Sequence, residues 1–288
     1  MSTKKTFSII VVCYNAGEKL QKTIASIRRQ TEDDYEIIVQ DGLSTDGSVE
    51  RLFAGADLKL FRERDEGIYD AMNRAVSHAS GKYLFFLNCG DYFADEEVLA
   101  AVKREIEKSD RTLCADGLRK PGAGGRRPPR IFYGNIRERA TGAYVMSNPV
   151  IDDFACYRNV PCHQACFYDR RLLAKRGFRT CFQVRADYEH FLWCYYRARA
   201  AMVYMPLTVA SYEGEGFSES GDNRKRSTAE HAHIVKKYMS RGQIFKYRLV
   251  MTLTLAPLRT FLAENEVTAG IYQKIKRGIY TGAVKGRG

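Results

Sequence analysis

The chain has 288 residues, a formal net charge of +12, 45% hydrophobic and 12% aromatic residues. This composition provides enough apolar material for a packed core, so it excludes a largely disordered protein. The longest uncharged stretches, residues 6–17 and 249–258, are too short for a bilayer-crossing helix, which needs about 20 apolar residues.

The first half of the chain alternates short apolar strands with amphipathic helices. Strands are predicted at residues 7–12, 35–39, 58–61 and 82–87, and helices at about 20–27, 49–53, 68–79 and 98–106. Repeated strand–helix units predict an α/β fold with a Rossmann-type, mostly parallel sheet covered by helices.

The second half is less regular. Residues 121–130 are rich in Pro, Gly and Arg, which predicts an exposed loop. Further strands are predicted at residues 131–133, 143–146, 164–168, 201–205 and 209–212, and helices at 188–199 and over most of 224–272.

The positive charge is concentrated at the C-terminal end. From Arg224 onward the sequence has 14 Lys and Arg residues against three acids, whereas the first 223 residues are nearly neutral. Such a segment can meet nucleic acid or an anionic membrane surface.

The cysteine pattern and the N-terminus favour the cytoplasm. The apolar run after Lys5 stops at Cys13 and meets no small-residue cleavage pattern, so no secretory signal is expected. The eight cysteines include no Cys-x-x-Cys pair, and the close group Cys162, His163 and Cys166 lacks the second ligand pair of a zinc ribbon. We therefore expect reduced, packed thiols.

Polar turns follow three of the predicted strands, at residues 13–15, 40–42 and 88–91. Asp, Asn and Gly are common in any turn, but ligands of open parallel sheets collect beyond the carboxyl ends of the strands. Three such turns at one edge indicate a polar ligand there. The first strand is not followed by G-x-G-x-x-G, and no P-loop motif occurs, so the common dinucleotide and phosphate loops do not explain them.

Nine segments, taken in order, resemble family-two glycosyltransferases with the GT-A fold. They are residues 8–15, 26–31, 36–39, 41–47, 65–73, 81–91, 162–168, 186–189 and 214–218. The likeness covers roughly residues 6–220, and it points to the branch that acts in bacterial polysaccharide biosynthesis. It implies transfer of a sugar from a nucleotide diphosphate donor, expected to be UDP-linked, to a hydroxyl of a glycan or polyprenyl-linked acceptor, usually with inversion.

The resemblance also implies a division of the chain. We expect a nucleotide-sugar-binding half at residues 1–110, a Gly/Pro/Arg-rich loop at 111–130 and a mixed acceptor-binding half of the same domain at 131–222. A basic, helical C-terminal segment follows at 223–288.

By the resemblance, seven residues contact the nucleotide: Cys13, Tyr14, Asn15, Asp41, Asp65, Asn88 and Asp91. Asp41 matches the carboxylate that hydrogen-bonds the donor base, because a carboxylate can accept from a ring N–H. A turn cap is the alternative role for Asp41. Asp65 and Tyr69 are expected to contact the sugar or ribose.

The metal motif departs from the family's Asp-x-Asp pattern. The turn reads Asn88-Cys89-Gly90-Asp91, so only Asp91 keeps a carboxylate, with Asn88 as a neutral oxygen ligand. A departing nucleoside diphosphate gathers negative charge, which a divalent cation neutralises. We expect Mg²⁺ or Mn²⁺, held by Asp91, the donor phosphates and water.

The acceptor hydroxyl must lose its proton as it attacks, and a carboxylate can take it. By resemblance Asp187 is this general base, at the start of a helix, with Glu189 as the second choice; an ordinary N-cap is the alternative for Asp187. His163 and Gln164 are expected at the acceptor or the diphosphate, and a core hydrogen-bonding role is equally consistent for His163.

Two interpretations of the basic segment remain open. Cations around the apolar residues 249–258 suit a helix lying on an anionic membrane, which would place a cytoplasmic enzyme at the inner face of the membrane. The alternative is a helical cap that packs Leu249, Leu253 and Leu255 on the sheet. The segment contains no known nucleic-acid motif, so nucleic acid is not an expected partner.

Two other functions compete with transfer. The changes at Asn88 and Gly90 allow a catalytically impaired nucleotide-sugar-binding homologue. A nucleotidyltransferase is less favoured, because such enzymes carry a Gly-rich basic loop after the first strand, where this chain has residues 13–17.

Overall fold

The computed structural model describes residues 5–52, 55–115, 127–213 and 221–253. The chain divides into two compact units, residues 1–234 and 235–288. The family-like segment 214–218, most of the expected loop 111–130 and the tail beyond residue 253, including Leu255, lie outside the described residues.

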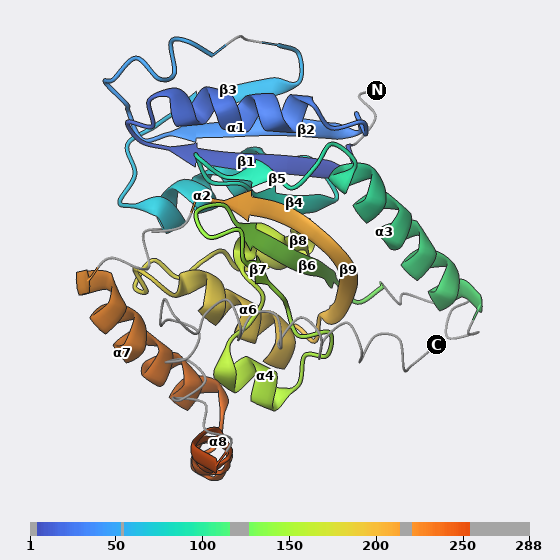
Figure 1. The fold of residues 1–288 in the computed structure, drawn as a ribbon, viewed down its shortest axis with the longest axis vertical. Coiled ribbons are helices and arrows are strands. Elements are labelled where there is room, and N and C mark those ends of the chain that lie inside the picture. Colours follow the sequence, from blue (N-terminus) through green and yellow to red (C-terminus); the bar gives the residue numbers. More distant parts are fainter. Residues whose placement is uncertain (1–4, 53–54, 116–126, 214–220, 254–288) are drawn as a thin grey trace. The chain divides into compact units, whose positions relative to one another are not determined.

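The first unit is built on a nine-stranded sheet with the order β3-β2-β1-β4-β8-β6-β9-β5, and β7 pairs with β6 (Figure 1). Its strands are β1 (Phe7–Cys13), β2 (Tyr35–Asp41), β3 (Leu58–Arg62), β4 (Tyr83–Phe86), β5 (Tyr92–Phe93), β6 (Arg130–Glu138), β7 (Tyr144–Val145), β8 (Cys166–Asp169) and β9 (Ala201–Tyr212). The first four strands in the order are parallel, whereas β8 pairs antiparallel with both β4 and β6. The predicted GT-A-like α/β fold, with a parallel first half and a mixed second half, is confirmed.

The parallel strands are buried on both faces, which explains their nearly continuous apolar sequence. Their register sets Cys13 beside Asp41, and Asp41 beside Arg62, at the carboxyl ends of β1, β2 and β3. Three neighbouring strand ends therefore bring a thiol, a carboxylate and a guanidinium together at the edge where the sequence predicts a ligand.

The helices of the first unit that have described bounds cover the sheet and connect its strands. They are α1 (Glu18–Arg28), α2 (Ile68–His78), α3 (Val98–Ala115), α4 (Asp153–Arg158), the single 3₁₀ turn η1 (His163–Ala165), α5 (Arg170–Lys175) and α6 (Ala186–Tyr196). Apolar side chains of α1 and α3 join the core formed by one face of β1 and β2. On α1 the buried Leu20, Ile24 and Ile27 recur at the predicted helical spacing.

Two predicted elements are wrong. Residues 49–52 form a turn rather than the start of a helix. The two strands predicted at 201–205 and 209–212 are one strand, β9, which continues past Pro206. The β6–β9 register shifts beside Gly134, where a Cβ would lie 2.6 Å from the Leu207 carbonyl oxygen, so the irregularity absorbs the proline.

The C-terminal part of the described chain is helical, as predicted. Helix α7 runs from Gly221 to Tyr238, so the division between the two units falls within it, and α8 runs from Arg241 to Leu253 in the second unit. Across the described ranges, none of the helices combines the length and apolarity that crossing a bilayer requires.

Candidate active site

Asp187 lies in the first turn of α6 and ends a hydrogen-bond chain that joins three elements. Its Oδ2 atom is 3.2 Å from Nδ1 of His163 in η1, and Nε2 of His163 is 3.1 Å from Nδ2 of Asn88, in the turn after β4. The structure thus brings together three residues that the sequence singles out, although 24 and 75 positions separate the two contacting pairs.

One tautomer of the imidazole satisfies both of these contacts. The Asn88 amide nitrogen can only donate, so Nε2 of His163 accepts and its proton resides on Nδ1. That Nδ1–H then donates to the Asp187 carboxylate.

The Asp187 carboxylate is held ionised while part of it stays accessible. Burial raises its pKa, but the hydrogen bonds from His163, the Tyr188 N–H and the Tyr69 hydroxyl lower it, and the net pKa is below the usual aspartate value. Tyr69 donates to Oδ1 over 3.0 Å, and burial keeps its own pKa well above that of a free tyrosine. The side chain of Asp187 is 25% exposed, so an incoming hydroxyl can reach it.

Glu189, the second choice for the base, is not accessible. Its side chain is 0% exposed and forms an ion pair with Arg176. Among the two acidic residues in the first turn of α6, only Asp187 faces the hydrogen-bond chain.

Asp91 and Gln164 lie beside this chain. Nε2 of Gln164 donates to Oδ2 of Asp91 over 3.4 Å, which links the turn after β4 to η1 a second time. Burial raises the pKa of Asp91, and the hydrogen bond from Gln164 and the charge of Arg139 oppose this only in part. A cation or another positive group at Asp91 would stabilise its ionised form.

Gly90 explains why the turn departs from an Asp-x-Asp pattern. Its φ is +96°, a conformation that glycine adopts without strain, and a Cβ there would lie 3.3 Å from Oε2 of Glu213. An aspartate at this position would be strained, so the local backbone selects glycine.

The turn can hold a divalent cation only with the help of a ligand. The Oδ1 atom of Asn88 is buried and has no hydrogen-bond partner, which leaves a neutral oxygen next to the Asp91 turn. No group of three or more His, Cys, Asp or Glu side chains that could hold a metal occurs in the part of the chain that the structure describes. One carboxylate and one amide oxygen fit Mg²⁺ or Mn²⁺ that takes its remaining ligands from phosphates and water.

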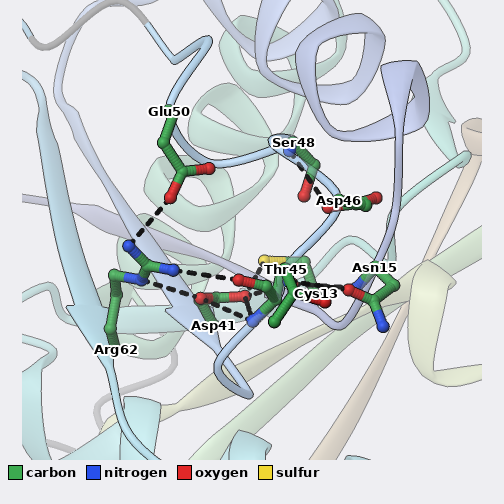
Figure 2. A network of polar contacts seen from close by, with 9 residues as sticks. Cys13, Asn15, Asp41, Thr45, Asp46, Ser48, Glu50 and Arg62 are labelled. Carbon is green, nitrogen blue, oxygen red and sulfur yellow. Dashed lines mark hydrogen bonds and ion pairs between the residues drawn. The ribbon is translucent and has the colours of Figure 1, made fainter.

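Asp41 forms a second network, at the ends of β1, β2 and β3 (Figure 2). Its carboxylate accepts hydrogen bonds from the backbone N–H and the hydroxyl of Ser44, from Nε of Arg62 over 3.1 Å and from Sγ of Cys13 over 3.6 Å. The side chain is 0% exposed. Figure 2 also shows Arg62 reaching Glu50 on its other side, at 3.0 Å. The carboxylate of Asp41 is thus fully used within the protein.

Asn15 ties the end of β1 to the same turn. Its N–H donates to Oγ of Ser44 over 2.8 Å, and its Oδ1 accepts from the Thr45 N–H over 2.9 Å (Figure 2). Its φ of +47° suits asparagine, which tolerates the left-handed region. In this structure Asn15 therefore shapes the turn.

Tyr14 and Asp65, two further members of the predicted nucleotide site, lie beside Gly42. Both approach Gly42: a Cβ there would lie 2.6 Å from Oδ2 of Asp65 and 3.4 Å from the ring of Tyr14. Tyr14 is 68% exposed, and Oδ1 of Asp65 accepts from the Gly67 N–H. The exposed ring can stack on a flat heterocycle, and the carboxylate can accept a hydrogen bond from it, because Gly42 has no side chain between them.

Cys13 connects the two networks. Its thiol contacts Asp41 on one side and Cys89, in the turn after β4, on the other; the hydrogen bond with Cys89 and burial raise its pKa far above that of a free cysteine. The predicted site residues therefore lie along one edge of the sheet, in two groups that meet at Cys13 and Cys89.

Sequence reasoning missed two cations at the Asp91 turn. Nη2 of Arg139 donates to the Gly90 carbonyl over 2.6 Å, and the Lys19 side chain lies 3.4 Å from the place of a Gly90 Cβ. Arg139 comes from the end of β6 and Lys19 from the start of α1, and nothing in either local sequence signals a role at this turn. Arg139 adds positive charge at this turn, whereas the charge of Lys19 is compensated by its ion pair with Glu213.

Comparisons with known proteins identify the chain as a nucleotide-sugar-dependent glycosyltransferase. The family model described as "Glycosyl transferase family 2" matches residues 8–176. The PGL/p-HBAD biosynthesis glycosyltransferase of Mycobacterium tuberculosis is 33% identical over 216 residues, which cover 73% of this chain and 77% of that protein. The chain belongs to glycosyl transferase family 2.

Solved structures agree on the fold. The mannosyltransferase PcManGT from Pyrobaculum calidifontis, in complex with GDP-Man and Mn²⁺, matches with a TM-score of 0.59 at 17% identity, over 98% of this chain and 81% of that one. Staphylococcus aureus TarS 1-349 in complex with UDP-GlcNAc matches with a TM-score of 0.53 at 15% identity, over 81% and 71%. This chain spans 42% of the longer TarS structure.

Proposed function

We propose that the protein transfers a sugar from a nucleoside diphosphate, UDP in the first instance, to a hydroxyl of a glycan or polyprenyl-linked acceptor, in bacterial polysaccharide biosynthesis. The observation that carries this proposal is the chain from Asn88 through His163 to Asp187, because it connects the turn proposed for the diphosphate to an ionised, partly exposed carboxylate. Donor and acceptor chemistry require these two features in one place.

Asp187 acts as the general base in this proposal. Its carboxylate accepts the proton of the attacking hydroxyl while the oxygen of that hydroxyl attacks the anomeric carbon from the face opposite the diphosphate. A single displacement of this kind inverts the configuration at that carbon. His163 and Tyr69 orient the carboxylate, and we assign His163 and Gln164 to the acceptor or diphosphate oxygens.

The leaving group is stabilised at the turn after β4. Asp91 and the free Oδ1 of Asn88 would hold a divalent cation, which when bound supplies positive charge to the departing diphosphate. Arg139 adds to that positive charge. The mannosyltransferase of similar fold was solved with Mn²⁺, which supports a cation in this class of site.

The nucleoside is proposed to lie over Gly42, with its base against Tyr14 and within reach of Asp65. Cys13, Asn15 and Asp41 form the floor of this site. Asp41 already has Ser44 and Arg62 as partners, so a direct hydrogen bond to the base requires Asp41 to share a lone pair. TarS was solved with UDP-GlcNAc and the mannosyltransferase with GDP-Man, so relatives of this fold take either nucleotide.

We also propose peripheral contact with the inner face of the cytoplasmic membrane, through α8. Phe245, Leu249 and Leu253 recur every four residues, lie on one side of the helix and are 70%, 49% and 71% exposed. The helix contains three cations (Arg241, Lys246 and Arg248) and no acid, which suits anionic lipid.

Sedimentation with lipid vesicles tests this contact. The protein should sediment with vesicles that contain phosphatidylglycerol but not with phosphatidylcholine alone, and Phe245→Glu with Leu249→Glu should abolish binding. Val150→Glu, at an apolar residue of the first unit that is 56% exposed, is the matched control. Failure of the unaltered protein to bind, or equal loss in the control, would contradict the membrane contact.

A panel of nucleotide sugars tests the proposed activity. Thermal shift with Mn²⁺ present should show stabilisation by a UDP-sugar, followed by transfer from that donor to an acceptor or its slow hydrolysis. Stabilisation with neither transfer nor hydrolysis would instead indicate the impaired binding homologue, which the Asn88 and Gly90 changes favour. Release of pyrophosphate from a nucleoside triphosphate and a sugar phosphate would indicate a nucleotidyltransferase.

A further inference from the structure

The segment that leads into α6 is held by a residue from a different part of the chain. Glu230, on α7, accepts hydrogen bonds from three successive backbone N–H groups, those of Gln183 (2.8 Å), Val184 (3.1 Å) and Arg185 (2.8 Å). The N-cap position of α6, Arg185, has no side-chain cap of its own. Glu230 therefore takes the place of a local cap, from 45 residues further along the chain.

Further contacts from α7 fix the same segment. Nε of Arg185 donates to Oγ of Ser227 over 2.8 Å, and the Ser227 residue is only 7% exposed. Arg226 pairs with the side chain of Gln183. One turn further along α7, the ring of His231 stacks on Tyr188, the residue after Asp187, with centroids 5.1 Å apart. The N-terminal part of α7 thus contacts both the 183–185 segment and the first turn of α6.

The held segment connects directly to the proposed base. The Val184 N–H binds Glu230, while the Val184 carbonyl lies 2.9 Å from the Tyr69 hydroxyl, which is 3.0 Å from Oδ1 of Asp187. A movement of the 183–185 segment would therefore displace Tyr69 and Asp187 together. Since Asp187 is two residues beyond Arg185, it would also change the direction of the α6 N-terminus.

We propose that Glu230 is a positioning residue for the transfer reaction: it fixes the 183–185 segment and thereby sets the place and direction of the Asp187 carboxylate. The basic C-terminal segment then has a second role besides the proposed membrane contact, because its first helix, α7, helps to hold the proposed base in place. This inference rests on the proposed function of Asp187. It concerns the acceptor side only, since Glu230 makes none of its described contacts with the turn after β4.

Glu230→Gln tests the proposal, because it keeps the size of the side chain but removes its charge. It also replaces one acceptor oxygen with an NH₂ group, which cannot accept hydrogen bonds from the three N–H donors. We expect the variant to fold, to bind the UDP-sugar donor with unchanged affinity, and to lose on the order of 10- to 100-fold in kcat, since small misplacements of a reacting group cost about that much. Lys225→Gln, at an exposed position of the same helix, is the control and should be unchanged. Glu230→Asp keeps the charge and should recover part of the kcat.

A double-variant cycle separates positioning from general destabilisation. If Glu230 acts through Asp187, then Glu230→Gln lowers kcat in the unaltered protein but causes little further loss in an Asp187→Asn background. An equal loss in both backgrounds, or a folded Glu230→Gln protein with normal kcat, would overturn the proposal. Normal transfer by Asp187→Asn alone would instead overturn the proposed function, so the two failures are distinguishable.

Discussion

Asp41 and Asp187 are both aspartates at the edge of one sheet, and the sequence assigns each a role in the same reaction, yet their surroundings differ. Asp41 is 0% exposed and its oxygens accept from Ser44, Arg62 and Cys13. Asp187 is 25% exposed, and its partners, His163 and Tyr69, belong to a chain that leads to the turn after β4.

The difference predicts separate roles, with Asp41 as a structural carboxylate and Asp187 as a reactive one. A buried carboxylate whose lone pairs are occupied stabilises the fold, because its charge is compensated within the protein. A carboxylate that is ionised, oriented and still accessible can accept a proton from a bound molecule. The following variants sharpen or break this contrast, from the largest expected effect on turnover to the smallest.

Asp187→Asn should cause the largest loss of activity. It removes the proton acceptor but keeps the shape of the side chain, so we expect kcat to fall about 10²- to 10⁴-fold, with little change in donor affinity or melting temperature. Because the pKa of Asp187 is lowered, the unaltered enzyme should keep its base ionised throughout the neutral range and lose activity only below the usual aspartate pKa. Full turnover by the variant would show that another group takes the proton.

Asp91→Asn should have the next largest effect. With one carboxylate at the turn, its loss should weaken cation binding and lower turnover on the order of 10²-fold with saturating Mg²⁺ or Mn²⁺ present. The measurement is initial rate against metal concentration, with Asp95→Asn, an exposed acid just beyond β5, as the control. Wild-type turnover in Asp91→Asn would rule out Asp91 as the ligand.

Asp41→Asn should act mainly on stability. The amide can accept at one oxygen only, so the Arg62 and Ser44 contacts are partly lost, and we expect the free energy of unfolding to fall by about 1–3 kcal/mol. Denaturant unfolding measures this change. If the variant unfolds normally but loses its preference between UDP and GDP, then Asp41 recognises the donor base. In that case Asp41 is not a purely structural carboxylate, and the proposed contrast with Asp187 is wrong.

Like Asp41, Glu36 has a carboxylate whose oxygens already have hydrogen-bond partners within the protein. Glu36 lies near the amino end of β2, away from the candidate active site. It accepts from Ser8, Ser80 and Gly81 and pairs with Lys59, and although burial raises its pKa, these partners lower it to about 2. The folded pKa is below the unfolded one, so its stabilising contribution is present above the unfolded value and is lost as the pH falls toward 2. Glu36→Gln should remove that part of the pH dependence of unfolding and leave turnover unchanged; reduced turnover at full folding would contradict the assignment.

Much of the parallel half could be predicted from the sequence. Apolar runs and helical spacing locate β1, β2 and β4, and parallel topology places the turns that contain Asp41 and Asn88 at one edge. The sequence could not show that the Asp41 carboxylate already has hydrogen-bond partners, because those partners depend on the strand register that sets Arg62 beside Asp41.

The contacts of the acceptor half could not be predicted from the sequence either, because they depend on pairing between distant parts of the chain. His163 reaches Asp187 and Asn88 because β8 inserts antiparallel beside β4, a pairing that periodicity does not predict. The Glu230 cap is equally non-local. The break predicted within β9 was wrong because a proline in a strand reads as an end, whereas the bulge at Gly134 accommodates it.

The most direct test of the central claim is a crystal structure of the protein with UDP and Mn²⁺. Our account predicts that the anomalous signal of the metal lies at the Asp91 carboxylate, that the diphosphate lies at the turn after β4, and that Asp187 faces the same cavity across His163. Binding of UDP and Mn²⁺ at a surface that does not include Asp91, with Asp187 outside the occupied cavity, would contradict it.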